Sequence, residues 1–316
     1  MHIPDGFLST PVWSAFDLLA IPAIGLVARR AKSSGETGAQ DDKLPLLGVM
    51  GAFVFAAQMI NFPVGVGTSG HLVGGALLAI ALGPAPAMLV MTAILAIQAF
   101  VFQDGGIMAL GANIFNMAIV GVLAGYLPYR MLARTSRSAA IFVGGMLSVM
   151  ASGMLALSEL TVSGVPMPRR LLFISLSVFL ANALIEGAIT LAAVRAIDRL
   201  NPAILNGRAG STSTRFGSPF TSPAFAIGAI AALILALAGI LLASTRPDGI
   251  ENLLAIPIAA SPTWIRRVLA GLGGIAMAYA LSALAAKFVL KRRPWDSAES
   301  SQPVAAAAQS AGNSLR

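Results

Sequence analysis

Apolar stretches separated by short polar segments run through most of the chain. Measured against the roughly 20 residues that a helix needs to cross a bilayer, these stretches predict nine helices. Seven are expected at residues 11–30, 44–61, 72–83, 85–102, 107–128, 139–160 and 171–197, and two more at 224–243 and 265–290. The pattern predicts an all-α, polytopic membrane protein in which a seven-helix bundle precedes a two-helix module.

A polar segment separates these two groups of helices. The stretch NGRAGSTSTRFGSPFTSP is rich in Gly, Ser and Thr, which is typical of a solvated linker. We therefore expect a membrane domain at 1–200, a linker at 201–223, a two-helix module at 224–293 and a disordered tail at 294–316.

The third predicted helix is too short to cross a membrane by itself. Its twelve residues span about 18 Å, against a hydrocarbon thickness of about 30 Å. The preceding stretch NFPVGVGTSGH is rich in Gly and Pro and ends at His71. Non-helical backbone is tolerated at membrane depth only where protein surrounds it or it lines a polar cavity. His71 is therefore expected inside the outer half of the bundle, as a metal ligand or as a hydrogen-bonded histidine at a helix start.

Composition and charge agree with a membrane protein. Of the 316 residues 57% are apolar and 11% are charged, the mean hydropathy is +0.82, and there is no cysteine. The formal net charge is +8, but the basic residues lie between apolar segments and form no nucleic-acid-binding stripe. An external amino terminus places sixteen of the 21 Lys and Arg residues on the cytoplasmic side, together with the carboxyl terminus, as the positive-inside rule favours.

The amino terminus itself has unusual chemistry. Asp5 lies where a signal peptide would be positive, and the large His2 disfavours removal of the initiator, so Met1 is expected to keep a free amine. That amine, the amide nitrogen of His2 and the Nδ1 atom of His2 can close two chelate rings around one metal ion. The imidazole of His71, the only other histidine, would complete a square of four nitrogens, the geometry of Ni(II) or Cu(II) and one accessible to Co(II).

Other chemistries find less support. Asp5 is expected to serve the turn that Pro4 and Gly6 favour rather than to bind the metal, because carboxylates suit harder cations. The chain contains no GxSxG, HExxH or GxxxxGK[ST] motif, so we expect neither an enzyme nor an ATPase site in it.

Three stretches, MHIPDGFLS, GTSGHLVGG and GANIFNM, closely resemble the CbiM/NikM family, the substrate-binding membrane components of energy-coupling-factor systems for cobalt and nickel uptake. The resemblance covers about residues 1–200. It implies a seven-helix bundle whose metal is held by Met1, His2 and His71, and partners that comprise a membrane coupling protein and two ATPase subunits. The stretch TRPDGIENLL resembles the PDGLE accessory module, with Ile250 replacing a leucine.

Several further residues have two interpretations each. Asn113, Ser69 and Asp104 are candidates to orient the metal ligands, although Asn113 is equally suited to interhelical hydrogen bonding and Ser69 to a helix cap. Gly48, Ala52 and Ala56 form a small-residue stripe that suits either a membrane partner or internal packing. Asp17 and Glu186 lie within predicted helices, where pairing with neighbouring polar groups is favoured over an ion path.

The sequence thus predicts a subunit that captures Ni²⁺ or Co²⁺, as substrate and without a cofactor, at the outer face of the inner cell membrane. The alternative is an ion-coupled secondary permease for divalent metals. That permease would need paired carboxylates near the middle of the membrane, and only Asp17 and Glu186 are available.

Overall fold

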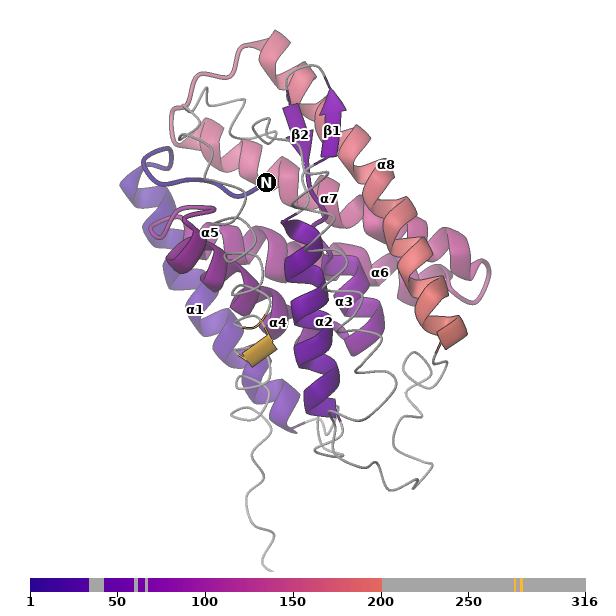
Figure 1. Ribbon diagram of the computed structural model, residues 1–316. Helices are drawn as coiled ribbons and strands as arrows, with labels where there is room; N and C mark the ends of the chain where they lie inside the picture. Colours follow the sequence, from indigo (N-terminus) through magenta and orange to yellow (C-terminus); the bar gives the residue numbers. More distant parts are fainter. Residues whose placement is uncertain (34–42, 60–61, 66–67, 201–275, 277–278, 281–316) are drawn as a thin grey trace, which may run out of the picture.

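Helices succeed one another along the part of the chain that the structure, a computed structural model, describes: residues 1–33, 43–59, 62–65, 68–200, 276 and 279–280 (Figure 1). Two of the helical stretches contain π-helical segments, η1 and η2. The helical elements are α1 (Thr10–Ser33), α2 (Lys43–Gln58), α3 (Gly75–Leu82), α4 (Pro84–Ile97), η1 (Gln98–Phe102), α5 (Leu110–Asn113), η2 (Ile114–Gly121), α6 (Val122–Leu132), α7 (Arg137–Val162) and α8 (Arg169–Leu200).

The predicted helical membrane fold is confirmed. Each of the seven helices expected before residue 200 has a counterpart, with η1 continuing α4 and with α5, η2 and α6 forming one continuous stretch. Five stretches among the described residues are long and apolar enough to cross a membrane: Thr10–Ala31, Pro84–Phe102, Leu110–Leu132, Arg137–Val162 and Arg169–Arg199. The predicted linker, two-helix module and tail lie outside the described residues, apart from residues 276 and 279–280.

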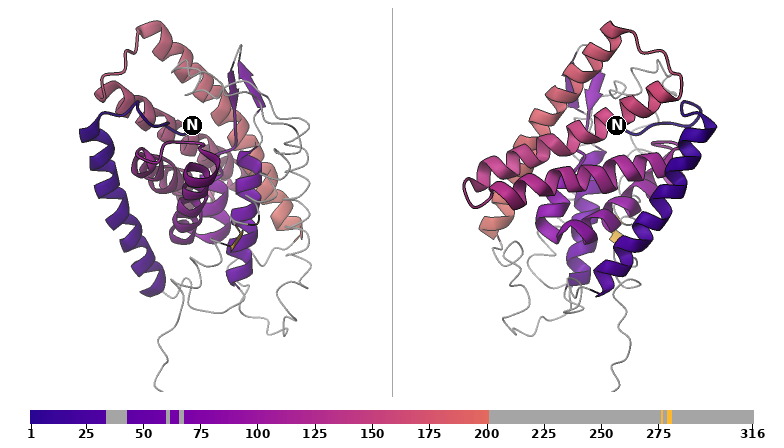
Figure 2. Two further views of the ribbon diagram at one scale, coloured as in Figure 1. Left: turned by 60° about the vertical axis from the view of Figure 1, so that its left-hand side comes forward. Right: turned by 180° about the vertical axis from the view of Figure 1, so that it is seen from behind.

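The non-helical segment before His71 contains a small hairpin. Strand β1 (Phe62–Gly65) pairs antiparallel with β2 (Thr68–Gly70), and Phe62 lies opposite Gly70. The hairpin stands at the end of the bundle that also holds the amino terminus (Figures 1 and 2). Helix α3 begins at Gly75 rather than at the expected residue 72, because Gly74 has a φ of 76° and breaks the helical path there. The structure thus places His71 on non-helical backbone between β2 and α3.

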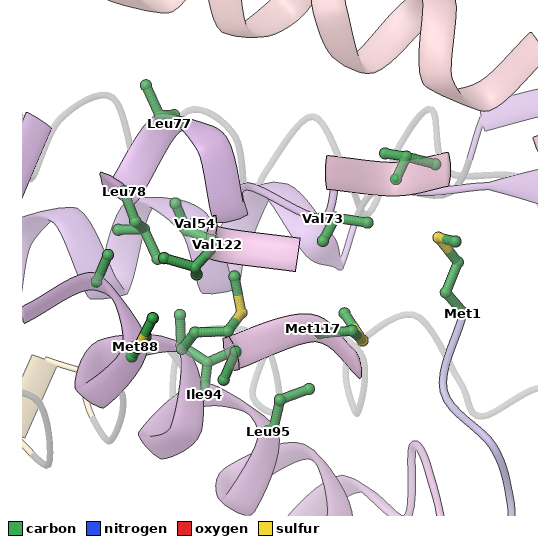
Figure 3. Close-up of a cluster of buried hydrophobic side chains, with 14 of the residues drawn as sticks. Met1, Val54, Val73, Leu77, Leu78, Met88, Ile94, Leu95, Met117 and Val122 are labelled. Carbon is green, nitrogen blue, oxygen red and sulfur yellow. The ribbon is translucent and has the colours of Figure 1, made fainter. Parts of the chain in front are cut away.

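Buried apolar side chains from α2, α3, α4, η2 and α6, joined by others from α7 and α8, form the core. Val54, Leu77, Ile94 and Met117 are each no more than 1% exposed. Figure 3 shows the Met1 side chain at the edge of this cluster, beyond Val73 and Met117. The first residue of the chain is therefore part of the core and not a free end.

The small-residue stripe on α2 is buried. Gly48, Ala52 and Ala56 are all inaccessible, and the ring of Tyr279 lies against Gly48 closely enough to leave no room for a Cβ atom. At Gly48 the stripe is therefore covered from within the chain, and docking of a membrane partner on it stays a prediction.

Helices α7 and α8 pack with their backbones in close contact at Gly145, and a substitution there tests this packing. A Cβ atom at Gly145 would lie 2.8 Å from the Cα atom of Gly187 in α8, whereas one at Gly25 would meet nothing within 4 Å. We expect Gly145→Ala to destabilise the fold by about 1–3 kcal/mol, because backbone atoms cannot move aside cheaply. Gly25→Ala, the matched control, should be neutral or stabilising, since alanine favours a helix. Thermal unfolding midpoints in detergent check this, and equal midpoints for the two variants would contradict the packing.

Candidate metal centre

The first three residues enter the bundle as a non-helical segment. Both backbone polar groups of Ile3 are hydrogen-bonded there. The Ile3 N–H donates to Oδ1 of Asn113 at 2.8 Å, and the Ile3 carbonyl accepts from Nδ2 of Asn113 at 3.0 Å and from the Gly106 N–H at 2.9 Å. Met1, His2 and Ile3 are 6%, 4% and 0% exposed. Asn113 thus binds the amino-terminal segment as a neighbouring strand would, and in this way it orients Met1 and His2.

The terminal amine and the loop histidine meet directly. The Met1 nitrogen lies 2.8 Å from Nε2 of His71, and Nδ1 of His71 lies 2.9 Å from the carbonyl oxygen of Leu72. Because a carbonyl only accepts hydrogen bonds, Nδ1 carries the ring proton, and Nε2 presents its lone pair to the Met1 amine. That lone pair is the one with which a neutral imidazole binds a metal.

His2 lies flat against His71. The two rings are nearly parallel, at 5°, with centroids 5.3 Å apart. Nδ1 of His2 lies 3.1 Å from Oδ1 of Asp104, and its Nε2 atom is buried without a hydrogen-bond partner among the described residues. The sequence predicts that Met1, His2 and His71 share one site. In the structure these three residues lie next to one another.

Asp104 supplies negative charge at the outer edge of this cluster. Its side chain remains 42% exposed while that of His2 is 3% exposed. Burial raises the pKa of the Asp104 carboxyl, but its interaction and hydrogen bond with His2, together with the charge of the terminal amine, outweigh this effect and hold the pKa well below its ordinary range. The site therefore carries an ionised carboxylate that favours cations.

The spacing of Met1 and His71 fits two neighbouring corners of a square metal site. Nitrogen ligands lie about 2.0 Å from a first-row metal, which separates adjacent nitrogens of a square by about 2.8 Å. The observed distance between the Met1 amine and Nε2 of His71 is also 2.8 Å. For His2 to close its chelate ring, its Nδ1 atom must exchange the hydrogen bond to Asp104 for the metal.

The Asp5 carboxylate has a role that the sequence did not reveal. The expected turn is present, and Gly6 has a φ of 88° in it. The Asp5 carboxylate accepts hydrogen bonds from the N–H groups of Ile107, Met108 and Ala109 at 3.0, 2.8 and 3.3 Å. Asp5 thus caps the start of α5 and ties the amino-terminal segment to it. The helix begins at Leu110 and not at the expected residue 107.

Polar side chains within the helices are also hydrogen-bonded, and one of them, Gln58, contacts the loop that follows His71. Gln58 of α2 donates to the Val73 carbonyl at 2.6 Å and accepts from Gln98 at 2.8 Å. Asn116 donates to Glu159 at 2.9 Å, and Asp17 accepts from the Gly111 N–H at 2.8 Å. The contact of Gln58 was missed from the sequence, although an isolated glutamine in an apolar helix is the signal that could have revealed it.

The expected role of Ser69 in orienting the metal ligands remains a prediction. Its backbone belongs to β2, paired with Pro63 of β1. Its position two residues before His71 is consistent with a role in shaping the loop.

Comparisons with known proteins relate the chain to metal transporters. Residues 2–204 match the model of a protein family described as a cobalt uptake substrate-specific transmembrane region. A crystal structure of a truncated transition metal transporter superposes with a TM-score of 0.55 at 29% sequence identity, covering 63% of this chain and 99% of the other.

Three relatives illustrate the range of similarity. A protein of Haloquadratum walsbyi, named provisionally as a metal transport protein, is 50% identical over 155 residues, which are 49% of this chain and 69% of that protein. The fused nickel transport protein NikMN of Rhodobacter capsulatus is 40% identical over 134 residues, 42% of this chain and 38% of its own. The cobalt transport protein CbiM of Acetoanaerobium sticklandii is 38% identical over 149 residues, which are 47% of this chain and 61% of that protein. The match therefore spans less than two thirds of the last two proteins.

Asn113 offers the clearest test of how the amino-terminal segment is held. Asn113→Ala would leave the N–H group of Ile3 buried without its acceptor, at a cost of about 1–3 kcal/mol. We expect the variant to bind Ni²⁺ at least tenfold more weakly than the parent, because the segment that carries two of the predicted ligand residues loses its anchor.

The matched control for Asn113→Ala is Asn116→Ala, since Asn116 is equally buried but contacts Glu159 rather than the amino terminus. That variant should lose thermal stability while keeping its affinity for the metal. Isothermal titration calorimetry measures both affinities, and equal Ni²⁺ affinities for the two variants would show that Asn113 does not serve the site.

Proposed function

The chain belongs to the family of cobalt uptake substrate-specific transmembrane regions, and from this premise we propose that it is the metal-capturing component of an ATP-driven uptake system for nickel or cobalt. It is a membrane protein of the transport type, as its helices and the names of its relatives indicate. In this proposal the amino terminus faces outward, and the metal is captured from the external side of the cell membrane.

The contact between the Met1 amine and Nε2 of His71 supports the proposal most directly. The 2.8 Å distance brings together two nitrogens that are 70 residues apart in sequence, at the spacing of neighbouring ligands. The amide and Nδ1 nitrogens of His2 supply the remaining two corners once the amide proton is lost. This set of four nitrogens suits Ni(II) best and admits Co(II), whereas zinc prefers a tetrahedron.

The energy for uptake comes from other subunits in this proposal. No GxxxxGK[ST] motif occurs in the 316 residues, so ATP hydrolysis is assigned to two separate ATPase subunits that act through a membrane coupling protein. The PDGLE-like segment around residue 247, which lies outside the described residues, is assigned to metal loading.

The contacts of Asp17 and Glu186 disfavour the alternative of a secondary permease. An ion-coupled permease needs carboxylates that can bind and release the coupling ion. Asp17 instead accepts from the Gly111 N–H, and Glu186 accepts from two backbone N–H groups of the His71 loop. Both carboxylates are engaged in holding helix starts, and a third buried carboxylate, Glu159 of α7, accepts a hydrogen bond from Asn116.

An extension of the amino terminus tests the chelate without removing any side chain. Adding Gly-Ser ahead of Met1 replaces its amine by an amide and forces two residues into a space that is already filled, since Met1 is 6% exposed. We expect Ni²⁺ and Co²⁺ binding to fall at least a hundredfold in calorimetric titrations. The same dipeptide added after Arg316 is the control and should leave binding unchanged. Undiminished binding by the amino-terminal extension would place the metal elsewhere.

Acid should weaken binding. The amine, the amide and the imidazoles must all be deprotonated to bind the metal, so protons compete with it. Between about pH 8 and pH 5.5 we expect the apparent affinity for Ni²⁺ to fall progressively. Titrations in buffers of different ionisation enthalpy should also show proton release on binding. A constant affinity over this range, with the protein folded throughout, would argue against a site made of nitrogens.

A further inference from the structure

One carboxylate from a distant helix holds the backbone next to His71. Glu186 of α8 is 1% exposed, and its two oxygens accept hydrogen bonds from the N–H groups of Val73 and Gly74, each at 2.8 Å. These two N–H groups directly precede α3, whose first turn contributes no acidic residue of its own. The carboxylate thus takes the place of a local helix cap, and it does so from 112 residues away in sequence.

The contact reaches the metal site through a single rigid group. The N–H of Val73 and the carbonyl of Leu72 belong to the same peptide unit, which is planar. Glu186 binds the N–H side of this unit, and Nδ1 of His71 donates to its carbonyl side at 2.9 Å. Fixing the plane of this peptide therefore fixes the direction in which the His71 ring is held, and with it the direction of the Nε2 lone pair.

The same connection also affects the strength of the ligand. A carboxylate that accepts from one end of a peptide group polarises the group and makes its carbonyl a better acceptor. A stronger acceptor on Nδ1–H increases the electron density at Nε2, as carboxylates do when they support metal-binding histidines directly. Here the peptide unit stands between the carboxylate and the imidazole.

Neighbouring residues restrain the same stretch from two sides. Asn182 lies one turn before Glu186 on α8 and donates to the His71 carbonyl at 3.4 Å. Gln58 of α2 donates to the Val73 carbonyl at 2.6 Å. The loop is therefore held between α2 and α8, and Glu186 provides the only charged contact among these three.

We propose that Glu186 is a positioning residue of the metal site, which orients His71 and strengthens Nε2 as a ligand through the Leu72–Val73 peptide group. This inference rests on the proposed function, because it takes His71 to be a metal ligand. Glu186 would thus change the metal affinity indirectly, without contacting the metal or its ligand residues.

Glu186→Gln is the variant that tests the proposal. The amide keeps the size of the side chain but turns one acceptor into an N–H donor that faces a backbone N–H donor. We expect the full-length protein, with its native amino terminus, to bind nickel(II) sulfate about 10–100-fold more weakly in calorimetric titrations. The visible absorption band of bound Cu(II) should also shift to longer wavelength, because one nitrogen of the square is held less well.

Glu159→Gln is the matched control. Glu159 is similarly buried, at 4% exposed, and lies in an apolar helix, but its hydrogen bond goes to Asn116 and not to the His71 loop. This variant should keep both the affinity and the Cu(II) band of the parent. A merely structural role for Glu186 predicts a lower thermal midpoint with unchanged affinity and an unchanged band below that midpoint, and this result would overturn the proposal.

Two further variants complete the experiment. If Glu186→Gln does not fold, Glu186→Asp is measured by the same criteria, since it keeps the charge but is too short to reach both N–H groups. His71→Ala is titrated in parallel. Loss of binding in His71→Ala with native binding in the Glu186 variant rejects the positioning role alone, whereas native binding in both rejects the proposed metal site as well.

Discussion

The requirement that every backbone polar group at membrane depth find a partner determines much of this structure. No water is available there to replace a missing hydrogen bond, so an irregular segment can enter the bundle only where other parts of the protein satisfy it. Two such segments do so here, the amino-terminal residues and the stretch from β2 to α3. Each ends beside a helix start, where the first N–H groups have no partner within the helix.

Side chains from distant elements meet this requirement. Asp5 accepts hydrogen bonds from three backbone N–H groups just before α5, and Asp17 accepts one from the N–H group of Gly111. Glu186 accepts hydrogen bonds from the two N–H groups just before α3. Asn113 does the same for both backbone groups of Ile3. These contacts stabilise the bundle, and they also determine where the irregular segments lie. The restraint that makes the fold possible is thus the one that brings Met1 against His71.

The same contacts organise the proposed metal site. The Met1 amine and Nε2 of His71 are already at ligand spacing, and the His2 ring is stacked on His71. For the proposed chelate to close, the His2 amide must lose its proton and Nδ1 of His2 must exchange its hydrogen bond to Asp104 for the metal. Because Asp104 is 42% exposed, water can take over the hydrogen bond that it gives up, and the exchange costs little.

The sequence by itself determined the helices and the chemistry of the amino terminus. Apolar segments of spanning length predict helices wherever they occur, and a histidine at position 2 can share a chelate with the terminal amine because covalent geometry places the three nitrogens together. The short third helix after a Gly- and Pro-rich stretch also indicated that His71 would lie on irregular backbone. The seven helices expected before residue 200 were predicted to within a few residues for the same reason.

Only the tertiary structure decided which distant groups hold these segments. Asp5 was interpreted as a turn residue, yet its carboxylate reaches residues 107–109, and Glu186 reaches the loop after His71. Such contacts join residues about 100 positions apart, and a carboxylate in an apolar helix looks the same in sequence whichever helix start it caps. The partner follows from the packing of whole helices, which no local pattern encodes, and that packing sets both where α3 and α5 begin and how His71 meets Met1.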